Sequence, residues 1–226
     1  MLIGLIATGC LSGGEPSDWV ADFNSPTEDL TENWSIEGTG TAAIRAGALQ
    51  LQETPDGVGV VLWTQREIAA DFRLSFDLSF SNSRAIGVIF FAARASDGRD
   101  ALADQAKRTG AYDDYIRGDL DSYSLSLHRY WPDGRNNPGS NLRRNSGFHL
   151  LDQALPDPCL AAEKIYRLEI EKQGAALTVW VDGKQTHHAV DDGSYGPPHG
   201  AGKIGFRLRG DVSCVMRIDN IRITER

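Results

Sequence analysis

The sequence predicts an all-β protein, a sandwich of two packed antiparallel sheets. Apolar and polar residues alternate with a period of two in short segments, which is the pattern of strands that bury one face. Asp-Gly turns separate several of these segments, and only residues 100–108 favour a helical turn or two. The predicted strands are residues 48–51, 58–63, 72–80, 86–94, 123–130, 166–171, 176–181, 203–208 and 215–223. This number of strands is enough for two sheets.

Two of these segments indicate different positions in the sandwich. Residues 73–80 alternate strictly, so we expect Leu74, Phe76 and their apolar partners to face the core while the polar residues face solvent. That pattern is typical of an outer, convex sheet. Residues 86–93 are apolar on both faces, which predicts a strand that is covered on its second side and forms the floor of a groove.

Length and charge restrict the class of protein. A chain of 226 residues can form one β-sandwich, and residues 19–226 contain no repeat and no linker, so we expect a single domain there. The chain has 23 Lys and Arg against 31 Asp and Glu, a formal net charge of -8. This balance repels phosphate backbones and anionic headgroups, which argues against nucleic acid or a lipid surface as a direct partner.

The first eighteen residues look like a leader and tether. Residues 1–10 are apolar and end in Ala-Thr-Gly-Cys, which resembles a bacterial lipobox with Cys10 as the acylated residue. This interpretation predicts a protein that is secreted or anchored outside a bacterial membrane by lipid alone. The alternative is an ordinary N-terminal tail with a buried cysteine.

The two remaining cysteines leave two alternatives open. In an oxidising compartment Cys159 and Cys214 form an even pair and are candidates for a disulfide. They are equally compatible with two separate buried thiols. Neither lies in a cluster with the spacing of a zinc site.

A polar region at residues 112–151 is the candidate site. Ser126 and His128 alternate with core leucines, His149 with Phe148 and Leu150, and Arg207 with Phe206 and Leu208, so these polar side chains are expected to face one groove. Trp63 is a candidate platform for the apolar face of a sugar ring. The alternatives are that His128 is an ordinary surface residue, that the arginines only solubilise a sheet edge, and that Trp63 belongs to the core.

Two pairs of acidic residues are further candidates for chemistry. Asp119 and Asp121 share a face if their segment is extended, which is one way to pair the acid and nucleophile of a retaining glycosidase. The alternative is an Asp-rich turn. Asp22 and Asp219 are candidates for a structural Ca²⁺ near the paired termini, and we expect no other cofactor.

Several motifs point to a family. These are Gly-Val-Ile-Phe-Phe-Ala-Ala at 87–93, the run 115–126 followed by Arg129, the segment 141–148, and the closing segments 202–207 and 218–223. Together they resemble the YesU-like family of bacterial domains of unknown function. The resemblance implies a concanavalin-A-like jelly roll and, as ligand, a plant or algal polysaccharide or its oligosaccharides.

Relatives of that fold suggest site residues by analogy. The Glu-x-Asp-x-x-Glu motif of laminarinase-type glycosidases is absent. Alginate-lyase-type sandwiches use Gln, His, Arg and Tyr in a concave groove, although their signature strands are absent too. By this analogy His128 or Tyr123 would move the proton, Arg129 and Arg143 would bind acidic groups, and Asn145 would donate a hydrogen bond. The remaining candidates for the groove wall are Tyr115, Arg117 and His149.

The leading hypothesis is a glycan lyase or glycoside hydrolase that works as a monomer. The alternative is a non-catalytic carbohydrate-binding surface lipoprotein, which needs aromatic residues and hydrogen bonders but no tuned acid or base. A purely structural adhesion domain would lack a deep groove.

Overall fold

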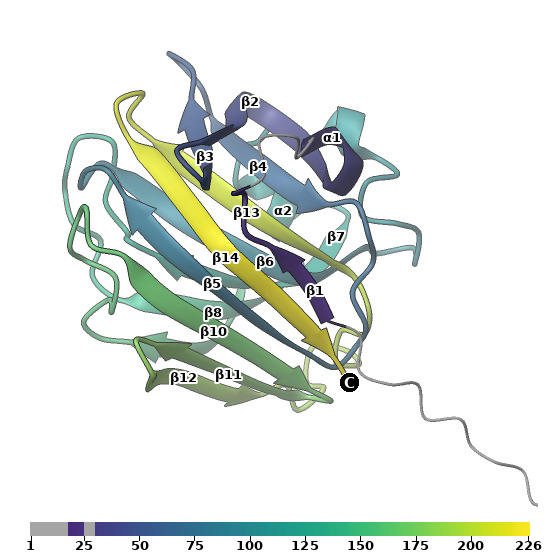
Figure 1. The fold of residues 1–226 in the computed structure, drawn as a ribbon. Coiled ribbons are helices and arrows are strands. Elements are labelled where there is room, and N and C mark those ends of the chain that lie inside the picture. Colours follow the sequence, from purple (N-terminus) through teal and green to yellow (C-terminus); the bar gives the residue numbers. More distant parts are fainter. Residues whose placement is uncertain (1–17, 25–29) are drawn as a thin grey trace, which may run out of the picture.

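The computed structural model describes residues 18–24 and 30–226 and shows a sandwich of antiparallel sheets, which confirms the predicted fold class (Figure 1). Cys10 lies outside the described residues, so its lipidation stays a prediction. Within the described part of the chain, no helix is long and apolar enough to cross a membrane.

The elements follow the chain in a nearly all-strand order. They are β1 (Asp18–Ala21), α1 (Leu30–Asn33), β2 (Trp34–Arg45), β3 (Ala48–Glu53), β4 (Gly59–Thr64), β5 (Phe72–Phe80), β6 (Ala85–Ala95), the 3₁₀ turn η1 (Gln105–Lys107), α2 (Asp113–Ile116), β7 (Leu120–Leu127), β8 (Ser140–Asn145), β9 (His149–Ala154), β10 (Tyr166–Gln173), β11 (Ala176–Val181), β12 (Lys184–Val190), β13 (Lys203–Gly210) and β14 (Val215–Glu225).

The strands form two sheets that share β2. The first sheet runs β12-β11-β10-β5-β14-β3-β2, with β1 also paired to β14, and it lies in front in Figure 1. The second sheet runs β2-β4-β13-β6-β7-β8-β9. Residues 34–39 of β2 pair with β4 and residues 40–45 pair with β3, so this one long strand passes from the second sheet to the first.

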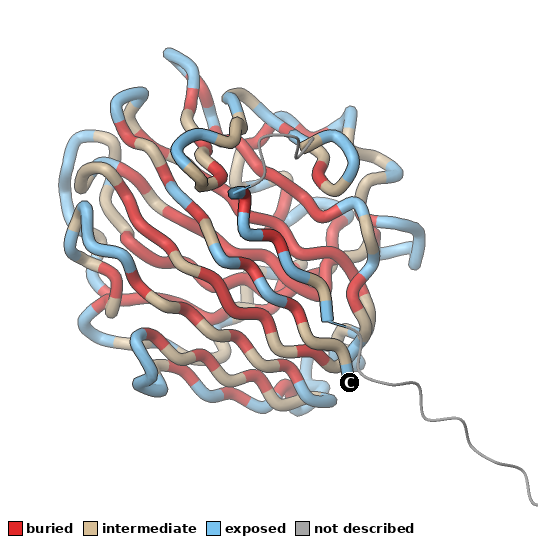
Figure 2. Tube along the Cα trace, in the orientation of Figure 1, coloured by how far each residue is buried: buried red, intermediate tan, exposed pale blue. Residues whose placement is uncertain are grey.

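The main core lies between the two sheets. On β5 the residues Leu74, Phe76, Leu78 and Phe80 are fully buried, as the strict alternation predicts. Phe76 meets Phe206 of β13 across the core, with ring centroids 5.2 Å apart in an edge-to-face arrangement. The alternation of buried positions with more exposed ones is visible along the strands of the front sheet in Figure 2.

A second apolar cluster lies on the outer face of the second sheet. Ile89 and Phe91 of β6 point into the main core, whereas Val88 and Phe90 point the other way. Phe90 packs there against Trp63 and Tyr115, beneath the segment that contains α2. The prediction that this strand is covered on both faces is therefore confirmed.

The sequence pattern misses strands that carry little apolar alternation. It does not predict β1, β2, β8, β9 or β12. β2 contains two glycines and passes between sheets, and β8 (Ser-Asn-Leu-Arg-Arg-Asn) is polar on the face that carries the site. The strand predicted to reach residue 130 ends at Leu127, and only a 3₁₀ turn forms within residues 100–108.

The two cysteines are separate thiols. Cys159 and Cys214 are both fully buried and both free, so the alternative of two buried thiols holds and the disulfide does not. Burial raises the pKa of each thiol, so both stay protonated at neutral pH.

Side-chain contacts link the edge strand of each sheet, β12 in the first sheet and β9 in the second. The backbone N–H of His188 donates to Asp152 Oδ2 at 2.8 Å. The Nε2 of the buried His187 lies 3.2 Å from the carbonyl oxygen of Ser140. These contacts cover edges that would otherwise offer free backbone groups to another strand.

We predict that Phe206→Ala lowers the free energy of unfolding by about 3–5 kcal/mol, because it leaves a cavity beside Phe76 and Trp34. Urea denaturation monitored by fluorescence measures the change. Leu150→Ala is the control: Leu150 is 49% exposed, and its truncation is expected to change stability by less than about 0.5 kcal/mol. Equal effects of the two substitutions would contradict the packing described.

A second prediction concerns acid sensitivity. Burial lowers the pKa of His187, so the folded protein keeps it neutral while the unfolded chain takes up a proton below about pH 6.5. The contribution of neutral His187 to the free energy of unfolding is therefore fully present above that pH. It is lost as the pH falls toward the pKa of His187 in the folded protein. Between about pH 7.5 and about pH 5.5 the parent protein should lose about 1 kcal/mol more than His187→Gln, measured by urea denaturation. An equal loss of stability in the parent and in His187→Gln would contradict the buried, neutral state of His187.

Candidate functional site

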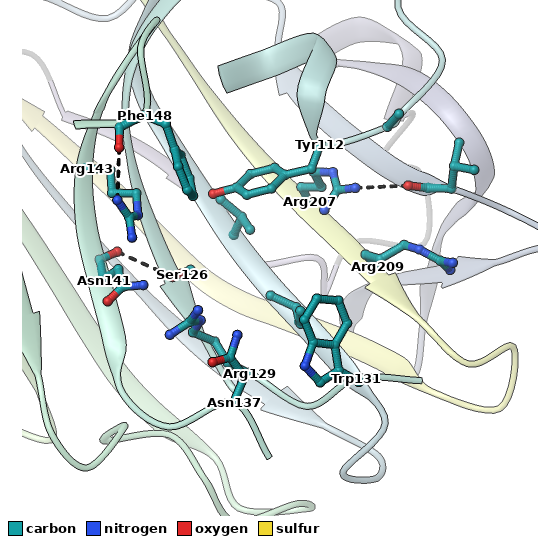
Figure 3. Close-up of a pocket in the computed structure, with 14 residues that line it drawn as sticks. Tyr112, Ser126, Arg129, Trp131, Asn137, Asn141, Arg143, Phe148, Arg207 and Arg209 are labelled. Atoms are coloured by element: carbon teal, nitrogen blue, oxygen red, sulfur yellow. Dashed lines mark hydrogen bonds between the residues drawn. The ribbon is translucent and has the colours of Figure 1, made fainter. Parts of the chain in front are cut away.

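The outer face of the second sheet holds a cavity of about 470 Å³ beside the covered half of that face (Figure 3). Strands β6, β7, β8 and β13 form its floor, and loops form its walls. The lining residues are Val58, Ile86, Val88, Ala111, Tyr112, Ser126, Arg129, Trp131, Asn137, Asn141, Arg143, Phe148, Arg207 and Arg209. Because four of these are arginines, we call it the arginine cavity.

Glycines let one wall of the cavity lie directly on the sheet. The loop before α2 crosses β2 and β4 at Gly110, which approaches the backbone of Gly38 and Gly59. A Cβ on Gly110 would lie 2.9 Å from Gly38 Cα and would run into the carbonyl oxygen of Gly59. Gly110 also has a φ of +94°, which favours glycine. The close approach places Tyr112, two residues later, over the floor.

Arg207 fixes this loop from below. Its guanidinium is buried, and its Nε and Nη2 donate to the carbonyl oxygen of Gly110 at 3.1 and 2.9 Å. Nη2 also donates to the carbonyl oxygen of Val58 at 2.9 Å. The same group lies 5.1 Å from the ring centre of Tyr112. Figure 3 shows the two side chains next to each other.

The other three arginines enter the cavity from different elements. Arg129 Nη1 donates to the carbonyl oxygens of Pro138 and Gly139, at 3.2 and 2.7 Å. Arg143 Nη1 donates to the carbonyl oxygen of Phe148 at 2.9 Å, and its guanidinium lies 3.9 Å from the centre of that ring. Arg209 donates to Glu53 Oε2 at 2.6 Å. No carboxylate is among the described residues that line the cavity.

Burial shifts the pKa values of the ionisable side chains in the cavity. It lowers the pKa of Arg129, Arg143 and Arg207, although arginine remains cationic at neutral pH. Burial raises the pKa of Tyr112, against an opposing effect of the nearby Arg207. The cavity is therefore cationic, and Tyr112 is a neutral phenol that can both donate and accept a hydrogen bond.

Aromatic side chains give the cavity its walls. Tyr112 and Phe148 meet edge to face with ring centroids 5.8 Å apart. Trp131 stands across the cavity from them in Figure 3 and keeps 45% of its surface exposed. An accessible indole at the rim of a polar cavity is a surface on which the C–H face of a sugar can stack.

The structure brings together four of the residues predicted from the sequence. Ser126, Arg129, Arg143 and Arg207 all line the arginine cavity. The sequence reasoning missed Tyr112, Trp131, Asn137, Asn141 and Phe148. All five fall inside the polar region 112–151, so the region was found although its individual side chains were not.

His128 does not reach the cavity, and its predicted position beside Ser126 is wrong. The strand ends at Leu127 and His128 has a φ of +50°, which turns its ring away from that face. The fully buried ring stacks on Phe80 with centroids 4.2 Å apart. Its Nδ1 and Nε2 each lie 2.8 Å from a carbonyl oxygen, of Cys159 and Asn82.

Trp63 lies on the expected face but is no platform. It is fully buried and stacks on Phe90 at 5.6 Å, with Tyr115 at 6.2 Å. The segment around α2 covers it. The alternative interpretation of Trp63 as a core residue is the one that the structure supports.

The two predicted tyrosines are buried away from the cavity. Tyr123 points between the sheets, where its hydroxyl donates to Asp191 Oδ2 at 2.6 Å. The Tyr115 hydroxyl donates to Glu37 Oε1 at 2.6 Å. Burial raises the pKa of both phenols, which opposes a role as a base.

Three other candidates also lie outside the cavity lining. Asn145 is fully buried and donates to the hydroxyls of Ser122 and Ser124. Arg117 is exposed and pairs with Asp113. The His149 ring stacks on Tyr195, with centroids 3.6 Å apart. Asn145 thus supports the floor, and the other two lie elsewhere on the surface.

The predicted carboxylates are placed apart from the arginine cavity as well. Asp119 is exposed and precedes β7, while Asp121 accepts from Ser96 Oγ at 3.1 Å and lines a separate hollow of about 270 Å³ beside His199. Burial raises the pKa of Asp219, and the negative charge of the nearby Asp22 adds to this effect. In the described ranges no group of three or more His, Cys, Asp or Glu residues is arranged to hold a metal ion, and the Ca²⁺ site remains an expectation.

Comparison with known proteins identifies relatives. A family model described as a domain of unknown function (DUF1961) matches residues 20–217. The uncharacterized protein YesU of Bacillus subtilis (strain 168) is 31% identical over 192 residues, which is 82% of this chain and 87% of YesU. The predicted resemblance to the YesU-like family is confirmed.

Solved structures agree with the fold. A protein of unknown function with a galectin-like fold from Bacillus subtilis matches with a TM-score of 0.81 at 28% identity, covering 94% of this chain and 96% of that one. The carbohydrate binding module CBM66 from Bacillus subtilis matches with a TM-score of 0.57 at 14% identity, covering 86% and 96%. The second similarity is one of fold alone.

The glycine contact yields a prediction for the cavity wall. Gly110→Ala should lower the free energy of unfolding by about 3 kcal/mol or more, because the loop must leave the sheet and Arg207 loses its carbonyl partner. Gly98→Ala is the matched control. Gly98 has a similar φ of +85°, but a Cβ added there would meet nothing within 4 Å, so only the backbone strain of about 1 kcal/mol is expected. Thermal unfolding of both variants measures the difference, and equal losses would show that the close approach is unimportant.

Proposed function

Since the chain belongs to the family described as a domain of unknown function (DUF1961), we propose its activity from its own residues: the arginine cavity binds a carbohydrate without cleaving it. The observation that carries the proposal is the lining itself. It combines an accessible indole and two further aromatic walls with amide, hydroxyl and guanidinium hydrogen bonders, and it includes no carboxylate or imidazole among the described residues.

The cavity has the size and chemistry of a binding site for a small part of a glycan. Its volume of about 470 Å³ lies within the range typical of small-molecule pockets. Ile86 and Val88 give an apolar floor, while Ser126, Asn137 and Asn141 can pair with sugar hydroxyls. A saccharide matches both kinds of surface, because its ring has an apolar face and a polar edge.

The same lining argues against hydrolysis or elimination. Glycoside hydrolysis normally uses two carboxyl groups beside the scissile bond, and the catalysts predicted from the sequence (His128, Tyr123, Asp119 and Asp121) lie outside the cavity. Tyr112 is the one titratable lining residue other than arginine among those described, and burial keeps it protonated. Elimination needs a base to abstract the proton, so a neutral phenol favours binding over catalysis.

The fold supports the proposal by analogy. A carbohydrate binding module has the same architecture, although fold similarity at 14% identity does not transfer a ligand. In the proposed role a lipid at Cys10 would hold the domain outside the membrane, where it would capture plant or algal polysaccharide or its oligosaccharides.

The direct test is an array of neutral and acidic oligosaccharides, followed by titration calorimetry and product analysis. The parent protein should bind one class without releasing reducing ends or unsaturated products. Trp131→Ala should weaken binding about tenfold, because the sugar loses its stacking surface.

The matched control is Tyr195→Ala, since Tyr195 is 54% exposed and lies outside the cavity. It should leave the affinity unchanged. Product release by the parent protein would show that the cavity is catalytic, and unchanged binding by Trp131→Ala would place the glycan elsewhere.

A further inference from the structure

The arginine cavity carries an excess of positive charge. The chain as a whole has a net charge of -8, yet four arginines line this one cavity. Arg209 has a carboxylate partner in Glu53. Arg129, Arg143 and Arg207 form no ion pair with any described residue, and their side chains contact carbonyl oxygens and aromatic rings. The carboxylate that acts on the charge of Arg129 is that of Asp157, whose Oδ2 accepts from the Arg129 backbone N–H at 3.2 Å.

The three arginines without an ion pair differ in which N–H groups they leave free. Arg207 uses Nε and Nη2 to hold the loop at Gly110 and Val58, so its role is structural. Arg129 and Arg143 make their side-chain hydrogen bonds through Nη1 alone. The Nε and Nη2 of both side chains therefore have no protein partner in the described part of the chain. These two atoms form the edge of a guanidinium that binds a carboxylate with two parallel bonds.

The positions of Arg129 and Arg143 favour one shared anion. The two side chains lie on the same side of the cavity in Figure 3. Burial lowers the pKa of Arg129; the nearby Asp157 opposes this effect, and the charge of Arg143 adds to it to a smaller extent. Two partly buried cations of like charge destabilise each other. An anion between them would remove that repulsion and replace the water lost on burial.

We infer that the cavity selects an acidic saccharide, and that a uronate carboxylate binds between Arg129 and Arg143. The inference rests on the proposed function, because it names the class of carbohydrate. A carboxylate is planar and matches the free edge of each guanidinium, whereas a hydroxyl would leave the charge of both arginines unopposed.

Neighbouring residues fit the rest of such a ligand. Gln153 Nε2 donates to Asn141 Oδ1 at 2.8 Å, which leaves the Asn141 amide N–H groups to donate into the cavity. Asn137 stands beside Arg129 in Figure 3, and Trp131 stands farther along the same wall. A uronate on the arginine pair therefore places the adjoining sugar toward the indole, so we expect the site to take at least two linked sugars.

The test compares saccharides that differ only in charge. Tetragalacturonate and tetramannuronate are titrated into the full protein by calorimetry, beside their fully methyl-esterified forms. Esterification removes the negative charge and keeps the sugars, so at least one acid form should bind about tenfold to a hundredfold more tightly than its ester. That preference should weaken as salt is added, because screening reduces the attraction between charges.

Variants then locate the carboxylate. Arg143→Gln and Arg129→Gln should each reduce the affinity for the acid form toward that of the ester, by a factor clearly larger than the factor by which they reduce the affinity for the ester. Arg217→Gln, on the exposed face of the first sheet, is the matched control and should change neither. Thermal unfolding checks that each variant is folded, and the comparison of acid with ester needs no variant.

The outcomes separate this inference from the proposed function. Equal binding of acid and ester would overturn the uronate inference and leave carbohydrate binding standing. Tighter binding of a sulfated galactan tetramer than of either uronate would also overturn it, because the anion would then be a sulfate. Binding of no saccharide, neutral or acidic, would remove both proposals together.

Discussion

The buried guanidinium of Arg207 is the contact on which the candidate site depends. Three hydrogen bonds from one side chain tie the loop at Gly110 and the turn at Val58 to strand β13. The cation in this position is stabilised by carbonyl dipoles, by the faces of Tyr112 and Tyr115 and by the nearby carboxylate of Glu53. Because Nε and Nη2 donate to these carbonyl oxygens, Nη1 is the nitrogen of Arg207 left to donate to a ligand. It instead keeps the aromatic wall in place before any ligand arrives, which lowers the entropy that binding would otherwise cost.

The position of the cavity follows from how the outer face of the second sheet is divided. Trp63 and Phe90 fill one half and are covered by the segment that contains α2, from which Tyr115 packs onto both of them. Beneath the covering segment, Glu37 forms a buried ion pair with Arg108 and accepts a hydrogen bond from the Tyr115 hydroxyl. The covering segment is therefore held by polar as well as apolar contacts. The other half of the sheet has no such cover. The edge of the covering segment, at Tyr112, is therefore also the wall of the cavity.

How far the sequence predicts this arrangement depends on whether a side chain lies in a regular strand. Within strands, the period of two placed Ser126 and Arg207 on the correct face and identified β6 as covered on both sides. The same rule puts Tyr123 on the core face with Leu125, so its assignment to the groove ran against the pattern. The predicted position of His128 is wrong because a positive φ at this residue ends the alternation of the strand. The prediction for Trp63 is wrong for a different reason. The pattern placed its side chain on the correct face of the sheet, but no local pattern shows that a distant segment covers it. Tyr112 and Trp131 lie in loops, where no period fixes the direction of a side chain.

The contrast between an acidic chain and its cationic cavity also indicates what kind of recognition is possible. At physiological salt, charges separated by more than about 8 Å are largely screened. The net charge of -8 therefore gives no long-range attraction for a polyanion, and near the surface it repels one. Any affinity for an acidic sugar must come from short-range contacts inside the cavity, where burial leaves little water to screen Arg129 and Arg143. Recognition of this kind depends on the geometry of one or two sugar residues more than on the charge density of a polymer.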